Sequence, residues 1–269
     1  MATNTSVEMS KEFYDIFAGL MVKNVLGKSM CFRKLDDYYV CCRWDEKTSN
    51  VLFYLMFDEY SFRFPGDEMT VNNFQVVLES CKRQGFLKDP SFKMNRVVDK
   101  KGDDVLQIYN KKSSMACRLY STKAYPDEIG FTEEIDFTDL DPVMFSFDLT
   151  AKDIQDIVEI CDGKLFECTY FHFSLKPDCV VLCFTGPHDI DYKIRIEKDR
   201  IKDFDKIEIG EEFKFNFKCF TIMDQLGLDY NIAVRTLDDN YNVHCNSQLT
   251  VGNQAIKSLI ISPSKVSNE

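Results

Sequence analysis

The 269-residue sequence lacks the patterns on which membrane proteins and common enzymes depend. It has no run of about 18 apolar residues, so no membrane-spanning helix is expected. The first nine residues have neither the basic region nor the apolar stretch of a signal peptide. No glycine-rich phosphate loop and no Gly-x-Ser-x-Gly motif occurs. These absences argue against a transporter, a nucleotide-binding enzyme and a serine hydrolase.

Metal-binding patterns are absent as well. There are only three histidines, and no Cys-x-x-Cys pair offers tetrahedral ligand spacing. Adjacent pairs such as Cys41-Cys42 and His244-Cys245 would point to opposite faces of a strand. We therefore expect no metal, no cofactor and no catalytic residue. The eleven cysteines lie scattered in apolar segments, which predicts buried free thiols in a reducing cytosol.

The charge balance is acidic, with 44 Asp and Glu against 33 Lys and Arg and a net charge of −11. A simple nucleic-acid binder is usually basic. The composition therefore argues against a tight, general grip on DNA, because most of the surface repels phosphates. A local basic lining is compatible with it.

Four short amphipathic segments each run toward a glycine, and the sequence between them is strand-like. Glycine ends helices readily because a left-handed turn there has no Cβ penalty. From Gly27 to Gly163 is 136 residues, and from Gly85 to Gly227 is 142, so one two-helix unit is used twice. The predicted helices are Ser10–Val25, Val71–Arg83, Ala151–Cys161 and Cys219–Leu226.

Two sequence features predict where helices begin. Thr70 is a candidate N-cap for the second helix. Thr150 with Asp153 forms a capping-box pattern ahead of the third. Before the fourth helix, Phe213, Phe215 and Phe217 alternate with Lys214, Asn216 and Lys218, which indicates a strand with one buried face.

The predicted strands cluster on both sides of a break-rich segment. Residues 121–143 contain Tyr125-Pro126-Asp127, Gly130 and a high density of carboxylates, which is typical of a linker. We therefore predict an N-terminal domain over residues 1–124, a linker over residues 125–142 and a C-terminal domain over residues 143–269. Each domain is an α+β unit in which two helices cover one face of an antiparallel sheet.

The sequence resembles the DNA polymerase sliding clamps, in the superfamily of proliferating cell nuclear antigen. Within it, the T-even bacteriophage type is the most similar. The resemblance is carried by the repeated order helix, strands, helix, strands, by the acidic linker, and by three segments in the second half. Those segments are Phe147-Asp148-Leu149-Thr150-Ala151-Lys152-Asp153, Glu212-Phe213-Lys214-Phe215-Asn216-Phe217 and Asp229-Tyr230-Asn231-Ile232-Ala233-Val234.

The resemblance implies a homotrimeric ring of two-domain subunits with helices lining the hole and sheets outside. Such a ring encircles double-stranded DNA without sequence readout and tethers the DNA polymerase as a processivity factor after a clamp loader has placed it. It implies a non-enzymatic protein in the cytoplasm of an infected bacterium. The residues then expected to face DNA are Lys11, Lys23, Lys28, Lys82, Arg83, Lys152, Lys164 and Lys218. Asp15, Glu79, Asp156 and Glu159 lie on or near the same faces and weaken this lining.

The resemblance also implies two protein-binding regions. Clamps dock a short apolar peptide near the linker and the last strand. By position, Tyr125, Pro126, Ile129, Ile261 and Pro263 are the pocket residues here, although they also suit plain linker and strand anchors. Subunits join by pairing edge strands, for which Met115–Tyr120 and Tyr192–Lys198 are the candidates.

Other functions stay open on the sequence alone. A clamp-fold coactivator could tether RNA polymerase, or factors associated with it, for late viral transcription. A viral processivity factor could instead grip DNA without encircling it, although the net charge disfavours that. An enzyme with an unrecognised site and a plain α+β scaffold are the alternatives from other classes. The carboxylates of residues 133–141 could bind a cation or act as acid–base pairs, but a solvated linker accounts for them.

Overall fold

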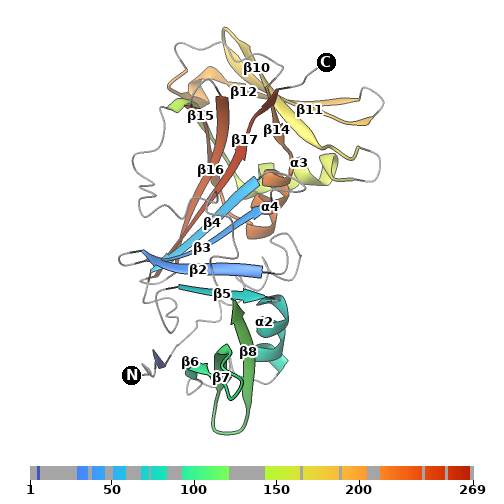
Figure 1. Cartoon of the computed structure of the whole chain (residues 1–269). Helices are drawn as coiled ribbons and strands as arrows, with labels where there is room; N and C mark the ends of the chain where they lie inside the picture. Colours follow the sequence, from blue (N-terminus) through green and yellow to red (C-terminus); the bar gives the residue numbers. More distant parts are fainter. Residues whose placement is uncertain are drawn as a thin grey trace. The chain divides into compact units, whose positions relative to one another are not determined.

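The fold is described by a computed structural model (Figure 1). It describes residues 5–6, 29–35, 38–45, 51–58, 68–72, 74–83, 93–120, 143–163, 166–187, 190–204, 213–237, 240–251 and 254–266. The predicted first helix, Ser10–Val25, and the predicted linker lie outside these residues. None of the helices in the part described is both long and apolar enough to cross a membrane.

The chain is an α+β protein with two compact units. The first comprises Met1–Arg43, Tyr54–Ile135 and Leu249–Lys257, and the second comprises Trp44–Phe53, Asp136–Gln248 and Ser258–Glu269. The predicted domain bounds remain a prediction, because the linker that defines them is not among the described residues.

The elements up to residue 120 are mostly strands. They are β1 (Thr5–Ser6), β2 (Ser29–Leu35), β3 (Tyr38–Asp45), β4 (Val51–Asp58), β5 (Glu68–Asn72), α2 (Phe74–Arg83), β6 (Lys93–Val98), β7 (Asp104–Tyr109) and β8 (Ser114–Tyr120). Their strand order is β1-β6-β7-β8-β5-β2-β3-β4. Leu106 and Ile108 of β7 and Val77 of α2 are buried, so these elements contribute to the core of the first unit.

The elements from residue 143 onward repeat the mixture of strands and helices. They are β9 (Val143–Leu149), α3 (Ala151–Cys161), β10 (Tyr170–Lys176), β11 (Cys179–Thr185), β12 (Asp191–Glu197), the 3-10 helix η4 (Lys198–Arg200), β13 (Ile201–Lys202), β14 (Phe213–Asn216), α4 (Lys218–Leu226), β15 (Tyr230–Leu237), β16 (Asn240–Val251), β17 (Gln254–Pro263) and β18 (Lys265–Val266).

These strands form two sheet regions in the second unit. One has the order β17-β16-β15-β9-β13 and the other the order β12-β11-β10-β14-β18. The registers defined for the described strands, such as β10 with β11 and β15 with β16, are antiparallel. This confirms the predicted α+β class with antiparallel sheets. Helices α3 and α4 lie next to each other (Figure 1). Helix α3 also contacts β9.

Phenylalanine side chains join the two sheet regions of the second unit. The ring centroids of Phe145 on β9 and Phe173 on β10 are 5.5 Å apart in an edge-on arrangement. The ring centroids of Phe171 on β10 and Phe220 on α4 are 5.1 Å apart. All of these rings are almost fully buried. Edge-to-face packing of this kind stabilises a core beyond the burial of area alone, and it explains why the sequence is rich in phenylalanine.

Helix α3 begins and packs as the sequence predicts. The backbone N–H of Asp153 donates to Thr150 Oγ1 at 3.1 Å, and the N–H of Thr150 donates to Asp153 Oδ2 at 2.9 Å. This reciprocal pair is the expected capping box. Ile154, Ile157 and Cys161 are buried on one stripe, at the spacing of an amphipathic helix.

Two predictions about helix ends are wrong. Thr70 does not cap α2: it lies in β5 opposite Cys31 of β2, because strand pairing there outweighs its capping preference, and α2 begins at Phe74. Gly163 does not take a left-handed turn, whereas Gly227 does, with φ of 62°. Helix α4, Lys218–Leu226, agrees with its predicted bounds within one residue.

Two further expectations on strands need correction. Met115–Tyr120 is not a sheet edge, because β8 pairs with β7 on one side and with β5 on the other. Asn216 does not face solvent: it is 8% exposed, and its Oδ1 accepts from the N–H of Lys218. The predicted edge at Tyr192–Lys198 does hold, since β12 is the terminal strand of its sheet region.

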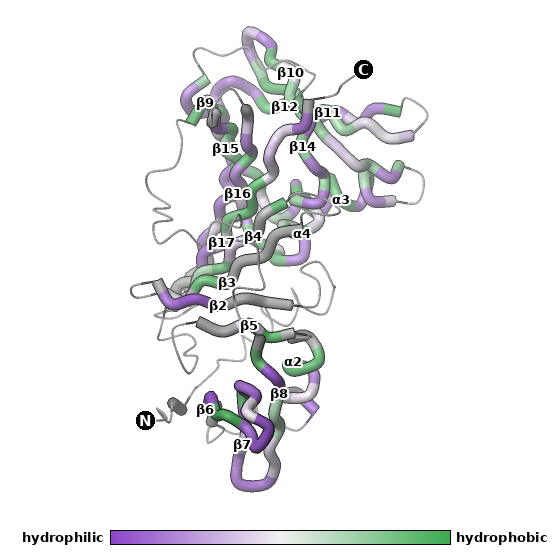
Figure 2. Tube along the Cα trace, in the orientation of Figure 1, coloured by the Kyte–Doolittle hydropathy of each residue, from purple (hydrophilic) through white to green (hydrophobic). Residues whose placement is uncertain are grey.

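Hydrophobic and hydrophilic residues are interspersed along the described strands and helices (Figure 2). The seven cysteines whose state the structure describes are free thiols, and six of them are buried. Cys117 is half-buried, and burial raises the pKa of its thiol to about 11. This confirms the expectation of buried free thiols for the described part of the chain.

Candidate nucleic-acid interface and docking site

The helices are the first candidate for contact with DNA, and their charges largely cancel. Helix α3 carries Lys152 against Asp153, Asp156 and Glu159, a net charge of −2. Helix α2 carries one acid against two bases, and α4 one of each. The three described helices together are therefore slightly acidic. Such faces would hold phosphates only weakly.

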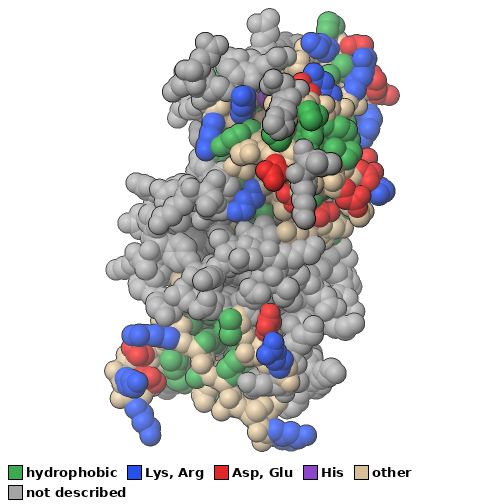
Figure 3. All heavy atoms as spheres, turned by 90° about the vertical axis from the view of Figure 1, so that its right-hand side faces the viewer, with side chains coloured by type: hydrophobic (Ala, Val, Ile, Leu, Met, Phe, Trp, Pro, Cys, Tyr) green, Lys and Arg blue, Asp and Glu red, His purple; other side chains and the backbone are tan. Residues whose placement is uncertain are grey.

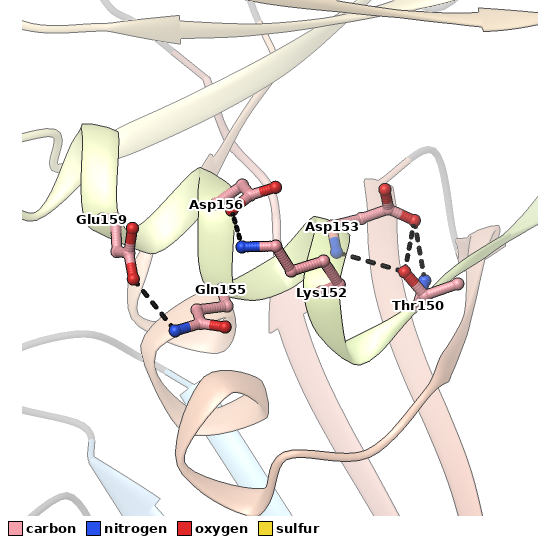
Figure 4. Close-up of polar contacts among 6 residues, drawn as sticks. All are labelled: Thr150, Lys152, Asp153, Gln155, Asp156 and Glu159. Atoms are coloured by element: carbon pink, nitrogen blue, oxygen red, sulfur yellow. Dashed lines mark hydrogen bonds and ion pairs between the residues drawn. The ribbon is translucent and has the colours of Figure 1, made fainter.

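Contacts on α3 reduce its cationic character further (Figure 4). Lys152 Nζ donates to Asp156 Oδ1 at 2.6 Å, one helical turn away, with both side chains exposed. The hydrogen bond and the negative charge of Asp156 raise the pKa of Lys152. Gln155 Nε2 donates to Glu159 Oε1 at 2.9 Å along the same face. A phosphate approaching Lys152 must therefore compete with a carboxylate that is already in place.

The other predicted DNA-facing residues are only partly described. Arg83 ends α2, with its side chain 81% exposed, and its Nη2 lies 3.5 Å from Glu79 Oε2. Lys218 is the first residue of α4, so it lies at the helix N-terminus, where the dipole disfavours a cation. Lys82 lies in α2. Lys11, Lys23, Lys28 and Lys164 lie outside the described residues. Their role at DNA stays a prediction.

The predicted docking pocket is represented by two residues of β17, Ile261 and Pro263, both half-buried. Tyr125, Pro126 and Ile129 lie outside the described residues. The N–H of Ser264 donates to the carbonyl of Tyr241 at 2.7 Å, which sets the register of β17 against β16. In an antiparallel pair this register places Ile261 across from His244.

His244 is the functional candidate that the sequence reasoning missed. It pairs with Ala233 of β15, which in turn pairs with Ser146 of β9, so these side chains share one face of the sheet. The opposite face holds Tyr230, whose hydroxyl lies 2.9 Å from Ser258 Oγ. Ile261, three residues beyond Ser258, is therefore on the face of His244.

His244 is a buried histidine near a positively charged residue, Arg235. The residue is 3% exposed, and its Nδ1 has no hydrogen-bond partner among the residues that the structure describes. Burial, helped by the charge of Arg235, lowers the pKa of His244 to about 4. The imidazole is therefore neutral near pH 7. On this face the half-buried Ile261 and Pro263, rather than the buried imidazole, are the side chains that a peptide could contact.

The described residues were also considered as ligands for a metal ion. No group of three or more His, Cys, Asp or Glu side chains in that part of the chain could hold a metal ion. The carboxylates of residues 133–141 lie outside it.

Comparison with known proteins identifies the fold. No protein-family profile and no curated sequence matches the chain. Solved structures do: a chain of the PCNA2–PCNA3 complex from Sulfolobus tokodaii is similar with a TM-score of 0.56 and 10% identity, over 98% of this chain and 99% of that one.

Two bacterial structures are similar over a smaller share of their own length. The beta clamp of H. pylori, solved with 5-chloroisatin, gives a TM-score of 0.55 and 14% identity, over 98% of this chain and 66% of that one. The DNA polymerase III subunit beta sliding clamp of Bartonella birtlesii gives a TM-score of 0.54 and 11% identity, over 100% of this chain and 63% of that one. The chain therefore has the sliding-clamp fold, as the sequence resemblance predicted.

Proposed function

We propose that this chain is a DNA sliding clamp, a non-enzymatic processivity factor that encircles duplex DNA and tethers a replicative DNA polymerase. The observation that carries the proposal is the match to a PCNA chain over nearly the whole of both chains. A fold shared from end to end supports a shared subunit architecture. The near-neutral charge of the described helices also fits, because a ring that must slide is better served by few and weak phosphate contacts.

The proposed assembly is a homotrimer, opened by a clamp loader, in the cytoplasm of an infected bacterial cell. The bacteriophage origin, the trimer and the loader rest on the sequence resemblance. Strand β12, which ends its sheet region, supplies one edge for pairing between subunits. Its exposed charges, among them Lys193 and Arg195, would keep that edge soluble in the free subunit.

For the partner peptide, we propose the face around Ile261 and His244. An apolar side chain of the polymerase would pack against Ile261 and Pro263, the half-buried residues of this face. A polymerase is the first expected occupant. Tethering of an RNA polymerase factor through the same face would make the protein a transcription coactivator instead.

Two measurements test the ring. Light scattering should give a mass three times the 31.3 kDa of the chain. The protein should stay on a closed plasmid through gel filtration and leave once the same plasmid is cut, so the cut plasmid is the matched control. A strict monomer at high concentration, or equal retention on cut and closed plasmid, would contradict encirclement. Equal retention would favour a factor that grips DNA directly.

A substitution tests the docking face. Ile261→Asp should abolish stimulation of primer extension by the DNA polymerase of the same replication system, while the trimer mass and plasmid retention persist. Ile190→Asp is the matched control, because Ile190 is also an apolar residue of the second unit and is 50% exposed. Equal stimulation by both variants would exclude this face as the polymerase site.

A further inference from the structure

The hairpins β6, β7 and β8 form a positively charged surface on an acidic protein. Residues 93–120 contain seven Lys and Arg against three Asp, a net charge of +4, whereas the whole chain carries −11. Lys and Arg side chains project from the lower part of the view in Figure 3, where Figure 1 places these strands and α2. At physiological salt a local patch acts independently of charges more than about 8 Å away.

The arginines of this surface are paired within it. Arg96 Nε donates to Asp104 Oδ2 at 2.8 Å across β6 and β7. Arg118 Nη2 donates to Asp103 Oδ1 at 2.6 Å. The two aspartates are therefore held on the sheet by arginines and leave the lysines of the turns to solvent.

The lysines lie at the two turns, at opposite ends of β7. Lys100 and Lys101 occupy the turn between β6 and β7, and Lys111 and Lys112 the turn between β7 and β8. All four are exposed, and no ion pair with them occurs among the residues that the structure describes. Each turn thus presents two adjacent positive charges.

Side-chain oxygens fix the shape of both turns. Asp99 Oδ1 accepts from the N–H of Lys101 at 2.8 Å and of Asp103 at 2.9 Å. Asn110 Oδ1 accepts from the N–H of Lys112 and of Ser113, both at 2.8 Å. These local bonds stabilise the turns themselves. The third carboxylate of the segment, Asp99, is therefore occupied with the backbone and does not pair with a turn lysine.

The distance between the turns suits a regular polyanion. The six residues of β7 rise about 3.4 Å each, so the two lysine pairs lie about 20 Å apart. A DNA duplex carries one phosphate charge per about 1.7 Å of axis, so about twelve phosphates lie within that length. We propose that the lysine turns of β6–β7 and β7–β8 are a second DNA contact, formed by turns of a sheet instead of by helices.

This contact rests on the proposed function only for the presence of DNA. It reads no sequence, because lysines on phosphates supply affinity and register but no base contacts. Its use in a clamp would be to hold the duplex where it leaves the ring. An acidic protein segment is the competing occupant, although such a segment has no fixed charge spacing to match two rigid turns.

The test compares two variants of equal charge. The turn variant carries Lys100→Gln, Lys101→Gln, Lys111→Gln and Lys112→Gln. The control carries Lys176→Gln, Arg200→Gln, Lys202→Gln and Lys214→Gln, which are exposed basic residues of the second unit outside the proposed pairing edge. Binding to a fluorescent 30-base-pair duplex is measured by anisotropy between 50 and 200 mM NaCl. Melting by circular dichroism checks that both variants fold.

We expect the turn variant to lose at least tenfold in affinity at 50 mM NaCl. The slope of log affinity against log salt should fall in magnitude by about 2 to 4, since each phosphate contact contributes about 0.9. The control should stay within twofold of the unchanged protein. Equal slopes for the two variants would overturn the proposal. A turn variant that loses binding to a polyglutamate peptide but keeps its DNA slope would assign the surface to an acidic protein and overturn it equally.

Plasmid retention separates this inference from the clamp itself. The turn variant could be retained on closed plasmid while its slope of log affinity against log salt equals that of the control. That result would contradict the DNA contact of the lysine turns and leave encirclement supported. The unchanged protein could instead be retained equally on cut and closed plasmid, while the turn variant shows a smaller slope of log affinity against log salt. That result would contradict encirclement and support the DNA contact of the lysine turns.

Discussion

Lys152 and Asp156 form an ion pair one turn apart on α3, with 2.6 Å between Nζ and Oδ1. The positive charge of Lys152, which was predicted to face DNA, is thus balanced by a carboxylate of the same helix. This pair, repeated in every subunit of a ring, would reduce the attraction between the lining and the phosphates.

Removing the carboxylate should therefore strengthen binding to DNA. In Asp156→Asn, Lys152 becomes available to a phosphate, and the salt slope for a short duplex should steepen by about 1. The control is Asp199→Asn, which removes one exposed negative charge from η4. If both variants bind alike, Lys152 lies away from the DNA. The melting temperature should stay unchanged, because exposed pairs contribute little to stability.

The capping box of α3 should be measurable in the stability of the second unit. Thr150→Ala removes the oxygen that accepts from the N–H of Asp153, and we expect a loss of about 1 kcal/mol in the free energy of unfolding. Thr150→Ser retains the oxygen and should lose much less. Urea unfolding followed by far-ultraviolet circular dichroism gives both values. Equal losses would show that the methyl group, rather than the cap, is what matters.

The buried hydroxyl pair of Tyr230 and Ser258 should behave as a coupled unit. Burial raises the pKa of Tyr230, so its hydroxyl stays protonated over the usual pH range. Tyr230→Phe leaves Ser258 Oγ without its partner and should destabilise the fold by about 1 to 3 kcal/mol. Ser258→Ala in the same chain should recover part of that loss, which a double-mutant cycle measures. Strictly additive losses would mean that the two hydroxyls do not interact.

His244 should make the protein less stable in acid. Its pKa falls from 6.5 to about 4 on folding, so between these values the unfolded chain binds a proton that the folded chain does not. The free energy of unfolding should therefore fall as pH drops from about 6.5 to 4 and level off below, with a total of about 3 kcal/mol. Above pH 6.5 the residue has no effect.

The variant His244→Asn isolates this contribution from that of the carboxylates. Urea unfolding at several pH values should show a shallower loss in the variant than in the unchanged protein, with the difference confined to the window from 6.5 to 4. Parallel curves for the two proteins would mean that His244 is protonated as easily in the folded state as in the unfolded one.

The sequence predicted correctly those elements whose structure depends on residues close together in the chain. Helix α3 and the turn at Gly227 follow from a capping box and from the preference of glycine for a left-handed turn. Thr70 was mispredicted because its strand pairs with β2, a contact distant in sequence. Asn216 is buried for a similar reason, since its N–H donates to Ser262 Oγ, 46 residues away.

In the candidate site, too, local patterns were predicted and contacts that depend on the folded structure were not. Amphipathic spacing identified the outward residues of α3, including Lys152, but the ion pair with Asp156 depends on side-chain rotamers. The position of Ile261 near the docking face came from the resemblance. The pairing of β16 with β17 then brought His244 beside it, and no local pattern marks a histidine in an apolar strand as anything but core.

The phenylalanine core described for the second unit also bears on how such a protein can be recognised. Rings such as Phe145, Phe171 and Phe220 are held by shape and burial, and many combinations of apolar side chains fill the same volume. A core of this kind constrains the volume and apolar character of its side chains more than their identity. That tolerance is compatible with a backbone fold shared with a PCNA chain at 10% sequence identity.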